Sequence, residues 1–288
     1  MQTVLSSLKI NSFFIFASLL TYMVGAIFAG FERNHIDSLG LVLGLLVFLI
    51  ILALQQLFNY LTTSKINPYT RVNFERGNKK GQLFILTGVF FLIYFFLIFS
   101  ILSLNLLIGV NLIYITLITI LMLMTIFRIG KLISLTYGVI IEGMIVSPLM
   151  LLFGTGMQGM NPTSGHVLLT LSFFFLYVSI GTSLLFEIYE RDLKGRERSL
   201  LDIIGWEHAV RLQNISLVLA YLVFFIYFYR NGSLGPNLTV LLTAVIGIFS
   251  MFLLNRMVRG MKPQWQIITA TAYLHFFAVC YLLVIPLI

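Results

Sequence analysis

Long apolar stretches recur along the whole of this 288-residue chain and limit what it can fold into. A helix that crosses a bilayer needs about 20 predominantly apolar residues, and segments of this kind follow one another without an insert of soluble-domain size. Hydrophobic residues make up 59% of the sequence and charged residues only 10%, which excludes an ordinary water-soluble protein. We therefore predict an all-α, polytopic integral membrane protein.

The apolar stretches predict nine transmembrane helices in a single domain that covers residues 1–288. The first stretch has some features of a signal peptide, but eight further spans follow it, so we interpret it as a retained helix. The predicted spans lie near residues 11–30, 41–61, 82–102, 106–127, 132–153, 167–186, 213–229, 238–255 and 266–286.

The basic residues are distributed unevenly between the two sides of the predicted membrane domain. Of the 18 lysine and arginine residues, only Arg33 and Arg230 fall on one side, which leaves 16 on the other. The positive-inside rule then places the N-terminus in the cytoplasm and the C-terminus outside the cell membrane. Membrane topology accounts for the net charge of +8, so we expect membrane lipids as partners and no nucleic acid.

Two connections on the predicted cytoplasmic side are long and polar. The first is "TTSKINPYTRVNFERGNKKG" (62–81), and the second is "FEIYERDLKGRERSLLDIIGWEH" (186–208), which holds six of the ten acidic residues. Loops of this length on one face are positioned to cover a single central cavity. We therefore hypothesise that the binding site of this protein lies near the cytoplasmic surface of the membrane.

Two segments resemble a known family. The sequence "DLKGRERSL" (192–200), followed by "LDIIG", resembles the end of the second aspartate motif of the UbiA superfamily of intramembrane prenyltransferases. The segment "TYGVIIEGMIVSPLMLLFGTGMQG" (136–159) resembles that family's fifth-helix region, in which a Glu follows a Tyr by five residues. The resemblance is nearest to the menaquinone branch. It implies a UbiA-like bundle of helices around a central cavity.

The first aspartate motif of the family is not present in this chain. The segment "LQQLFNYLTTSKINPY" (54–69) keeps Gln55 and Asn59 of the approach to that motif. The acidic positions of the motif are occupied instead by Thr62, Thr63, Ser64 and Ile66. The resemblance therefore implies substrate-binding roles for Gln55 and Asn59, but it supplies no first cluster of carboxylates.

The second motif keeps some of its acidic residues. Asp192 matches the later aspartate, whereas Ile188 stands at the earlier position with Glu187 beside it. Prenyl transfer requires neutralisation of the departing diphosphate, commonly by Mg²⁺. The resemblance makes Asp192, Glu187 and Glu190 candidate catalytic residues, and Asp192 and Glu187 candidate Mg²⁺ ligands. The alternative is that this segment continues a helix, on which the acidic residues form surface ion pairs with basic residues four positions later.

Other polar residues are candidates for binding the substrates. Basic side chains can bind a diphosphate or a lipid phosphate without a metal, although they also serve as topology determinants beside anionic headgroups. Glu142 lies inside a predicted span, where a carboxylate is costly and faces a cavity or a partner. The full set of candidate substrate-binding residues is Gln55, Asn59, Lys65, Arg71, Arg76, Tyr137, Glu142, Arg196 and Arg198.

These observations favour one function and leave others open. The first hypothesis is a transferase that moves a polyprenyl group from its diphosphate to an aromatic acceptor, as in menaquinone biosynthesis. The alternative is a non-catalytic relative that binds a quinone or a polyprenyl lipid in an electron-transfer or envelope pathway. A transporter fits the number of helices, but the sequence lacks the discontinuous spans that transporters use.

Overall fold

The computed structural model describes residues 2–46, 48–49, 138–192, 200–231 and 234–287. The chain divides into two compact units, residues 1–41 with 133–288 and residues 42–132, and the fold below is that of the first unit. The predicted spans near 41–61, 82–102 and 106–127 lie wholly or largely outside the described residues. The prediction of one domain over residues 1–288 stays a prediction.

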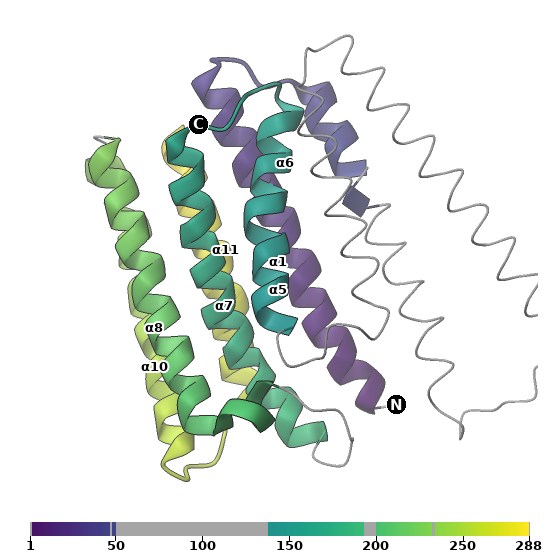
Figure 1. Ribbon diagram of the computed structural model, residues 1–288, viewed down its shortest axis with the longest axis vertical. Coiled ribbons are helices and arrows are strands. Elements are labelled where there is room, and N and C mark those ends of the chain that lie inside the picture. The colour runs from purple at the N-terminus through teal and green to yellow at the C-terminus, as the bar shows by residue number, and fades with distance from the viewer. Residues whose placement is uncertain (1, 47, 50–137, 193–199, 232–233, 288) are drawn as a thin grey trace, which may run out of the picture. The chain divides into compact units, whose positions relative to one another are not determined.

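The described part of the first unit consists of helices (Figure 1). Six of its helical segments are long and apolar enough to cross a membrane, and they coincide with six of the predicted spans. The helices are α1 (Gln2–Glu32), α5 (Gly138–Met144), α6 (Met150–Met157), α7 (Ser164–Asp192), α8 (Leu200–Arg230), α9 (Leu234–Leu242), α10 (Ala244–Val258) and α11 (Trp265–Val284).

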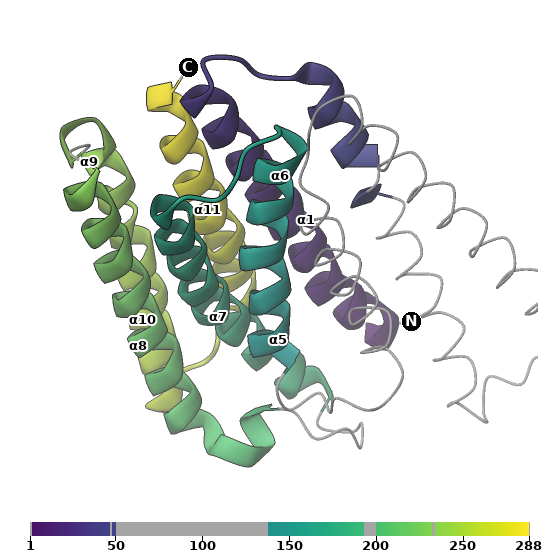
Figure 2. The same ribbon diagram turned by 45° about the horizontal axis from the view of Figure 1, so that its top comes forward.

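The helices pack side by side as a bundle in both views. α1 packs against α6, α7 contacts both α8 and α11, and α10 lies beside α8 (Figures 1 and 2). α7 ends and α8 and α11 begin at one end of this unit, which we call the basic end because Arg256, Arg259 and Lys262 lie there. Arg33 and Arg230 lie at the opposite end, where α1 and α8 finish. The described basic residues are therefore separated as the sequence predicts.

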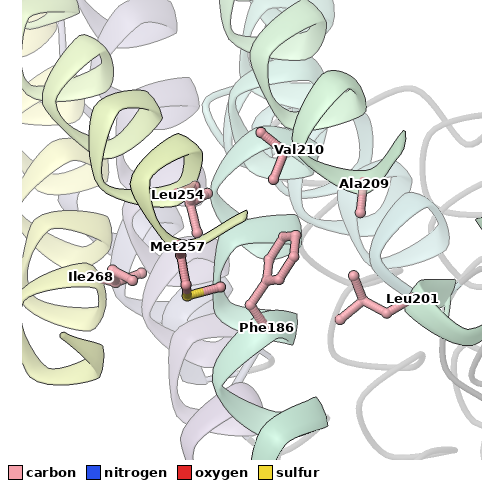
Figure 3. Close-up of a cluster of buried hydrophobic side chains, with 7 residues drawn as sticks. All are labelled: Phe186, Leu201, Ala209, Val210, Leu254, Met257 and Ile268. Atoms are coloured by element: carbon pink, nitrogen blue, oxygen red, sulfur yellow. The ribbon is translucent and has the colours of Figure 1, made fainter. Parts of the chain in front are cut away.

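A cluster of buried apolar side chains joins four helices at the basic end. Figure 3 shows these side chains, which come from α7, α8, α10 and α11. The ring of Trp206 lies edge-on to that of Phe186, with 5.3 Å between their centroids. The cluster fixes the position of the C-terminal part of α7, which carries the acidic residues of the second motif. Its buried members are Phe186, Leu201, Ala209, Val210, Leu254, Met257 and Ile268.

The structure corrects the predicted extent of the second long loop. Helix α7 continues to Asp192 and α8 already begins at Leu200, so much of the segment predicted as loop is helical. Gly205 interrupts α8 with φ 76° and ψ 163°, a conformation that is essentially restricted to glycine. The residues before Gly205 therefore form a short helix whose direction differs from that of the long span (Figure 1).

The span that contains Glu142 is not a uniform α-helix. A π-helical segment, Ile145–Leu149, separates α5 from α6 and contains Pro148. Proline has no backbone N–H and disrupts the regular hydrogen-bond ladder, and a π-bulge is one way in which a helix accommodates the change. The hydroxyl of the buried Ser147 donates a hydrogen bond to the carbonyl of Thr170 on α7, which ties this irregular segment to its neighbour.

Helices α8 and α11 are joined by a buried hydrogen-bond network. The Nε2 atom of His275 lies 2.7 Å from the hydroxyl of Tyr221, which lies 2.6 Å from the hydroxyl of Thr243. Thr243, which lies between α9 and α10, in turn donates to the carbonyl of Val240, so the chain of polar groups ends on the backbone of α9. His275 thus holds neighbouring helices together, which is the structural interpretation that a lone histidine among apolar residues favours.

Helices α1 and α6 approach each other closely at two glycines. A Cβ atom added to Gly154 would lie 2.2 Å from the carbonyl oxygen of Tyr22, and one added to Gly25 would lie 2.2 Å from that of Leu151. Side-chain movement cannot relieve these contacts because the neighbouring atoms belong to the backbone. Small residues at helix interfaces permit this kind of approach in membrane proteins.

We expect Gly154→Ala to destabilise the protein by about 1–3 kcal/mol, since the added methyl group forces α1 and α6 apart. Denaturation in detergent micelles measures the effect. Gly165→Ala is the matched control, because a Cβ atom there makes its nearest contact at 3.4 Å, which is an ordinary van der Waals distance. Equal stability of the two variants would contradict the close packing of α1 on α6.

We also expect the basic end to face the cytoplasm. The chain has a single cysteine, Cys280, which is buried, so single cysteines introduced at exposed positions report on topology with little background. In intact cells an impermeant maleimide should label Ser38→Cys at the opposite end and should leave Lys262→Cys unlabelled until the membrane is opened. The reverse labelling pattern would show that the orientation is inverted.

Candidate active site

The first acidic residue of the candidate site lies on α5. Glu142 is half-buried, and its Oε2 atom accepts a hydrogen bond of 3.0 Å from the hydroxyl of Tyr177 on α7. Two glycines bring α5 close to α7 at this level. A Cβ atom on Gly143 would lie 3.3 Å from the ring of Tyr177, and one on Gly181 would lie 2.8 Å from Val139. The close approach of the two helices places the phenol beside the carboxylate.

The second acidic residue lies on α7 at the basic end. The side chain of Glu187 is only 3% exposed, and its Oε2 atom accepts a hydrogen bond of 2.6 Å from the hydroxyl of Thr269 on α11. A carboxylate that is excluded from solvent to this degree does not occupy the surface position that the ion-pair interpretation requires. Glu187 therefore faces the interior of the bundle, toward α11.

Aromatic rings connect the levels of the two carboxylates. The ring of Phe13 on α1 stacks on Tyr177 with 5.6 Å between centroids and meets Tyr273 edge-on at 5.2 Å. Tyr273 lies one helical turn after Thr269 on the same face of α11, and its hydroxyl lies 2.8 Å from that of Ser12. Helices α1, α5, α7 and α11 therefore contribute to one continuous group of polar and aromatic side chains.

The two carboxylates lie at different depths in the bundle. Glu142 is bonded at the level of Tyr177, and a rise of about 1.5 Å per residue separates Tyr177 from Glu187 by about 15 Å along α7. Glu187 is thus near the basic end, whereas Glu142 is deeper within the span.

The remaining candidate residues are described only in part or not at all. Glu190 and Asp192 lie in the last turn of α7, where the structure describes the backbone alone. Eight candidate substrate-binding residues lie outside the described residues, so their roles stay predictions, as does the predicted central cavity. These eight are Gln55, Asn59, Lys65, Arg71, Arg76, Tyr137, Arg196 and Arg198.

A magnesium site is compatible with what the structure describes. Within the described ranges, no three His, Cys, Asp or Glu side chains gather closely enough to hold a metal ion. Mg²⁺ commonly binds one or two carboxylates together with substrate phosphates and water, so it does not require such a cluster. The bond from Thr269 orients Glu187 as supporting hydrogen bonds orient ligating carboxylates. The Mg²⁺ prediction therefore fits Glu187 and stays a prediction.

Several residues of this group were not predicted from the sequence. Tyr177, Thr269, Tyr273 and Phe13 lie in apolar spans, where each one alone has the pattern of a packing residue. One available signal was the spacing of Thr269 and Tyr273, which places two hydroxyl groups on the same face of one span. The partners of those groups belong to other helices, and the sequence does not indicate which helices are neighbours.

Comparison with known proteins supports the fold. No family model and no curated protein matches the chain. A solved structure of a digeranylgeranylglyceryl phosphate synthase in membranes is similar, with a TM-score of 0.67 and 16% identity over 100% of this chain and 99% of that one. The chain is thus a polytopic membrane protein whose helical fold is similar to that of this synthase.

We expect Thr269→Val to lower the free energy of unfolding by about 1.5–3 kcal/mol, since valine fills the space of threonine but removes a hydrogen bond to a buried charged group. Thr269→Ser is the control, because it keeps the hydroxyl. In detergent, denaturation should show a higher free energy of unfolding for the serine variant than for the valine variant. Equal stabilities would show that the hydroxyl of Thr269 does not hold Glu187.

Proposed function

We propose that this chain is an intramembrane prenyltransferase that moves a polyprenyl group from its diphosphate to a hydroxyl-bearing acceptor within the membrane. The observation that carries the proposal is the buried Glu187 carboxylate, held by Thr269 at the basic end of a bundle with this fold. Intramembrane carboxylates are costly and generally functional. The Glu187 carboxylate lies one and a half turns before Asp192, so we assign both residues to binding the charged headgroup of the donor.

We propose that the donor headgroup binds at the basic end, and that this end lies on the cytoplasmic side of the cell membrane. Basic side chains of the two long connections, including Arg71, Arg76, Arg196 and Arg198, would bind the diphosphate through charge-assisted hydrogen bonds. Mg²⁺ held by Glu187 and Asp192, when bound, would neutralise charge on the diphosphate as the C–O bond breaks. The chain of the donor would extend among the apolar helices, where water is excluded.

The acceptor is proposed to be an aromatic hydroxy compound of the kind used to make menaquinone, as the resemblance to that branch implies. The similar solved structure is named for a digeranylgeranylglyceryl phosphate, which makes a glyceryl phosphate the other acceptor to test. Both classes carry a hydroxyl group whose oxygen, or whose activated ring, attacks the allylic carbon. Glu142 and Tyr177 lie deep enough to meet the uncharged part of either molecule.

A second candidate function is favoured by the loss of the first aspartate motif. Without carboxylates at Thr62, Thr63, Ser64 and Ile66, a two-cluster metal site does not assemble. A protein of this kind would still bind a quinone or a polyprenyl lipid in its apolar interior. Such a protein would show binding without turnover, which the transfer assay distinguishes.

We expect the purified protein to transfer a polyprenyl group to at least one of the two acceptor classes. Glu187→Gln should lower the kcat by about 10²–10³-fold, which is the usual effect of removing one electrostatic group from a reaction centre. The assay compares polyprenyl diphosphates with each acceptor, with and without Mg²⁺. Glu207→Gln is the matched control, since Glu207 belongs to the same charged stretch but is exposed. Lipid binding without transfer would favour the second candidate.

A further inference from the structure

We propose that Glu142, oriented by Tyr177, is the group that takes the proton from the acceptor hydroxyl during prenyl transfer. This inference rests on the proposed function and assigns separate roles to the two carboxylates. Glu187 acts on the donor headgroup at the basic end, and Glu142 acts on the acceptor deeper in the span. Two acidic groups in different environments commonly divide the work of a reaction in this way.

The reaction itself requires a base. The allylic C–O bond breaks and its electron pair leaves with the diphosphate, while the acceptor supplies the electron pair of the new bond to the allylic carbon. The acceptor thereby loses its hydroxyl proton, which the carboxylate of Glu142 receives and later releases to water. A general base must lie within hydrogen-bond reach of the proton that it removes.

The position of Glu142 matches this task. Glu142 is half-buried, so part of its side chain is accessible to a bound molecule. About 15 Å along α7 separates Tyr177, to which Glu142 is bonded, from Glu187, so the two carboxylates belong to different levels of the bundle. A base beside Glu187 would instead compete with the headgroup for the same space.

The other described titratable groups in the spans are less suited to accept the proton. His275 is engaged with Tyr221 in the network that joins α8 to α11. The Nδ1 atom of His166 lies 2.8 Å from the hydroxyl of Thr163, in the turn where α7 begins at the opposite end of the unit. Neither histidine lies in the group of side chains formed by α1, α5, α7 and α11.

Tyr177 is the positioning residue for this base. Its side chain is 1% exposed and stacked on Phe13, so its hydroxyl has little freedom to leave the carboxylate. The hydrogen bond from the phenol fixes one oxygen of Glu142 and thereby the direction of the carboxylate. Loss of the phenol hydroxyl should therefore weaken proton transfer without removing the base.

The test is the dependence of the rate on the acidity of the acceptor. With a series of hydroxylated aromatic acids, Glu142→Gln should lower the kcat by about 10²–10⁴-fold for the least acidic hydroxyl, and the loss should shrink as acidity rises. Glu187→Gln should lower the kcat by a factor that does not change with the acidity of the acceptor. Tyr177→Phe should cause a smaller loss than Glu142→Gln and should shift the pH profile of kcat. The same variants are also assayed with a glyceryl phosphate as the acceptor.

Each other outcome counts against the inference. A Glu142→Gln loss that is independent of acceptor acidity would assign Glu142 to structure or binding, and undiminished activity would remove it from the reaction. If Glu142→Gln does not fold, Glu142→Asp serves instead, and an unchanged pH profile in that variant would overturn the proposal. Failure of the wild-type protein to prenylate either acceptor would reject the proposed function itself.

Discussion

The requirement that every polar group within hydrocarbon has a partner inside the protein determines much of this structure. Water is not available there, so a helix satisfies its own backbone, and polar side chains bond either to the backbone of their own helix or to groups on other helices. Glu142 is bonded to Tyr177, Glu187 to Thr269, and His275 to Tyr221. Each of these bonds joins two different helices. The polar groups therefore position the helices as well as any reaction centre.

The sequence predicted the part of the fold that depends on local composition. Apolar stretches of membrane-spanning length coincide with all six spans in the described residues, and the described basic residues separate to the two ends as the positive-inside rule requires. The extension of α7 to Asp192 agrees with the alternative interpretation of this stretch, whereas its acidic and basic residues had favoured a solvated loop. Charged residues four positions apart also stabilise a helix, so polarity alone did not decide between the two.

The candidate site was predictable only in its charged members. Glu142 and Glu187 are conspicuous because carboxylates are rare in apolar sequence. Tyr177, Thr269 and Phe13 are ordinary residues for a membrane helix, and their importance comes from contacts between helices that are far apart in the sequence. Such contacts depend on packing, including the approach of α5 to α7 at Gly143 and Gly181, and nothing in the local pattern specifies them.

The combination of low identity and full-length structural similarity has a physical explanation. Many apolar sequences satisfy the requirements of a helical membrane bundle, because lipid-facing positions need only be hydrophobic and interface positions need only be small or complementary. A fold can therefore persist at 16% identity while the reaction depends on very few polar side chains. Among the described residues of this chain, two carboxylates lie at different levels of the bundle, and each accepts a hydrogen bond from a hydroxyl group on another helix. In the proposed reaction the diphosphate and the acceptor hydroxyl are separate polar groups, and this is why we assign the two separated carboxylates to different substrates.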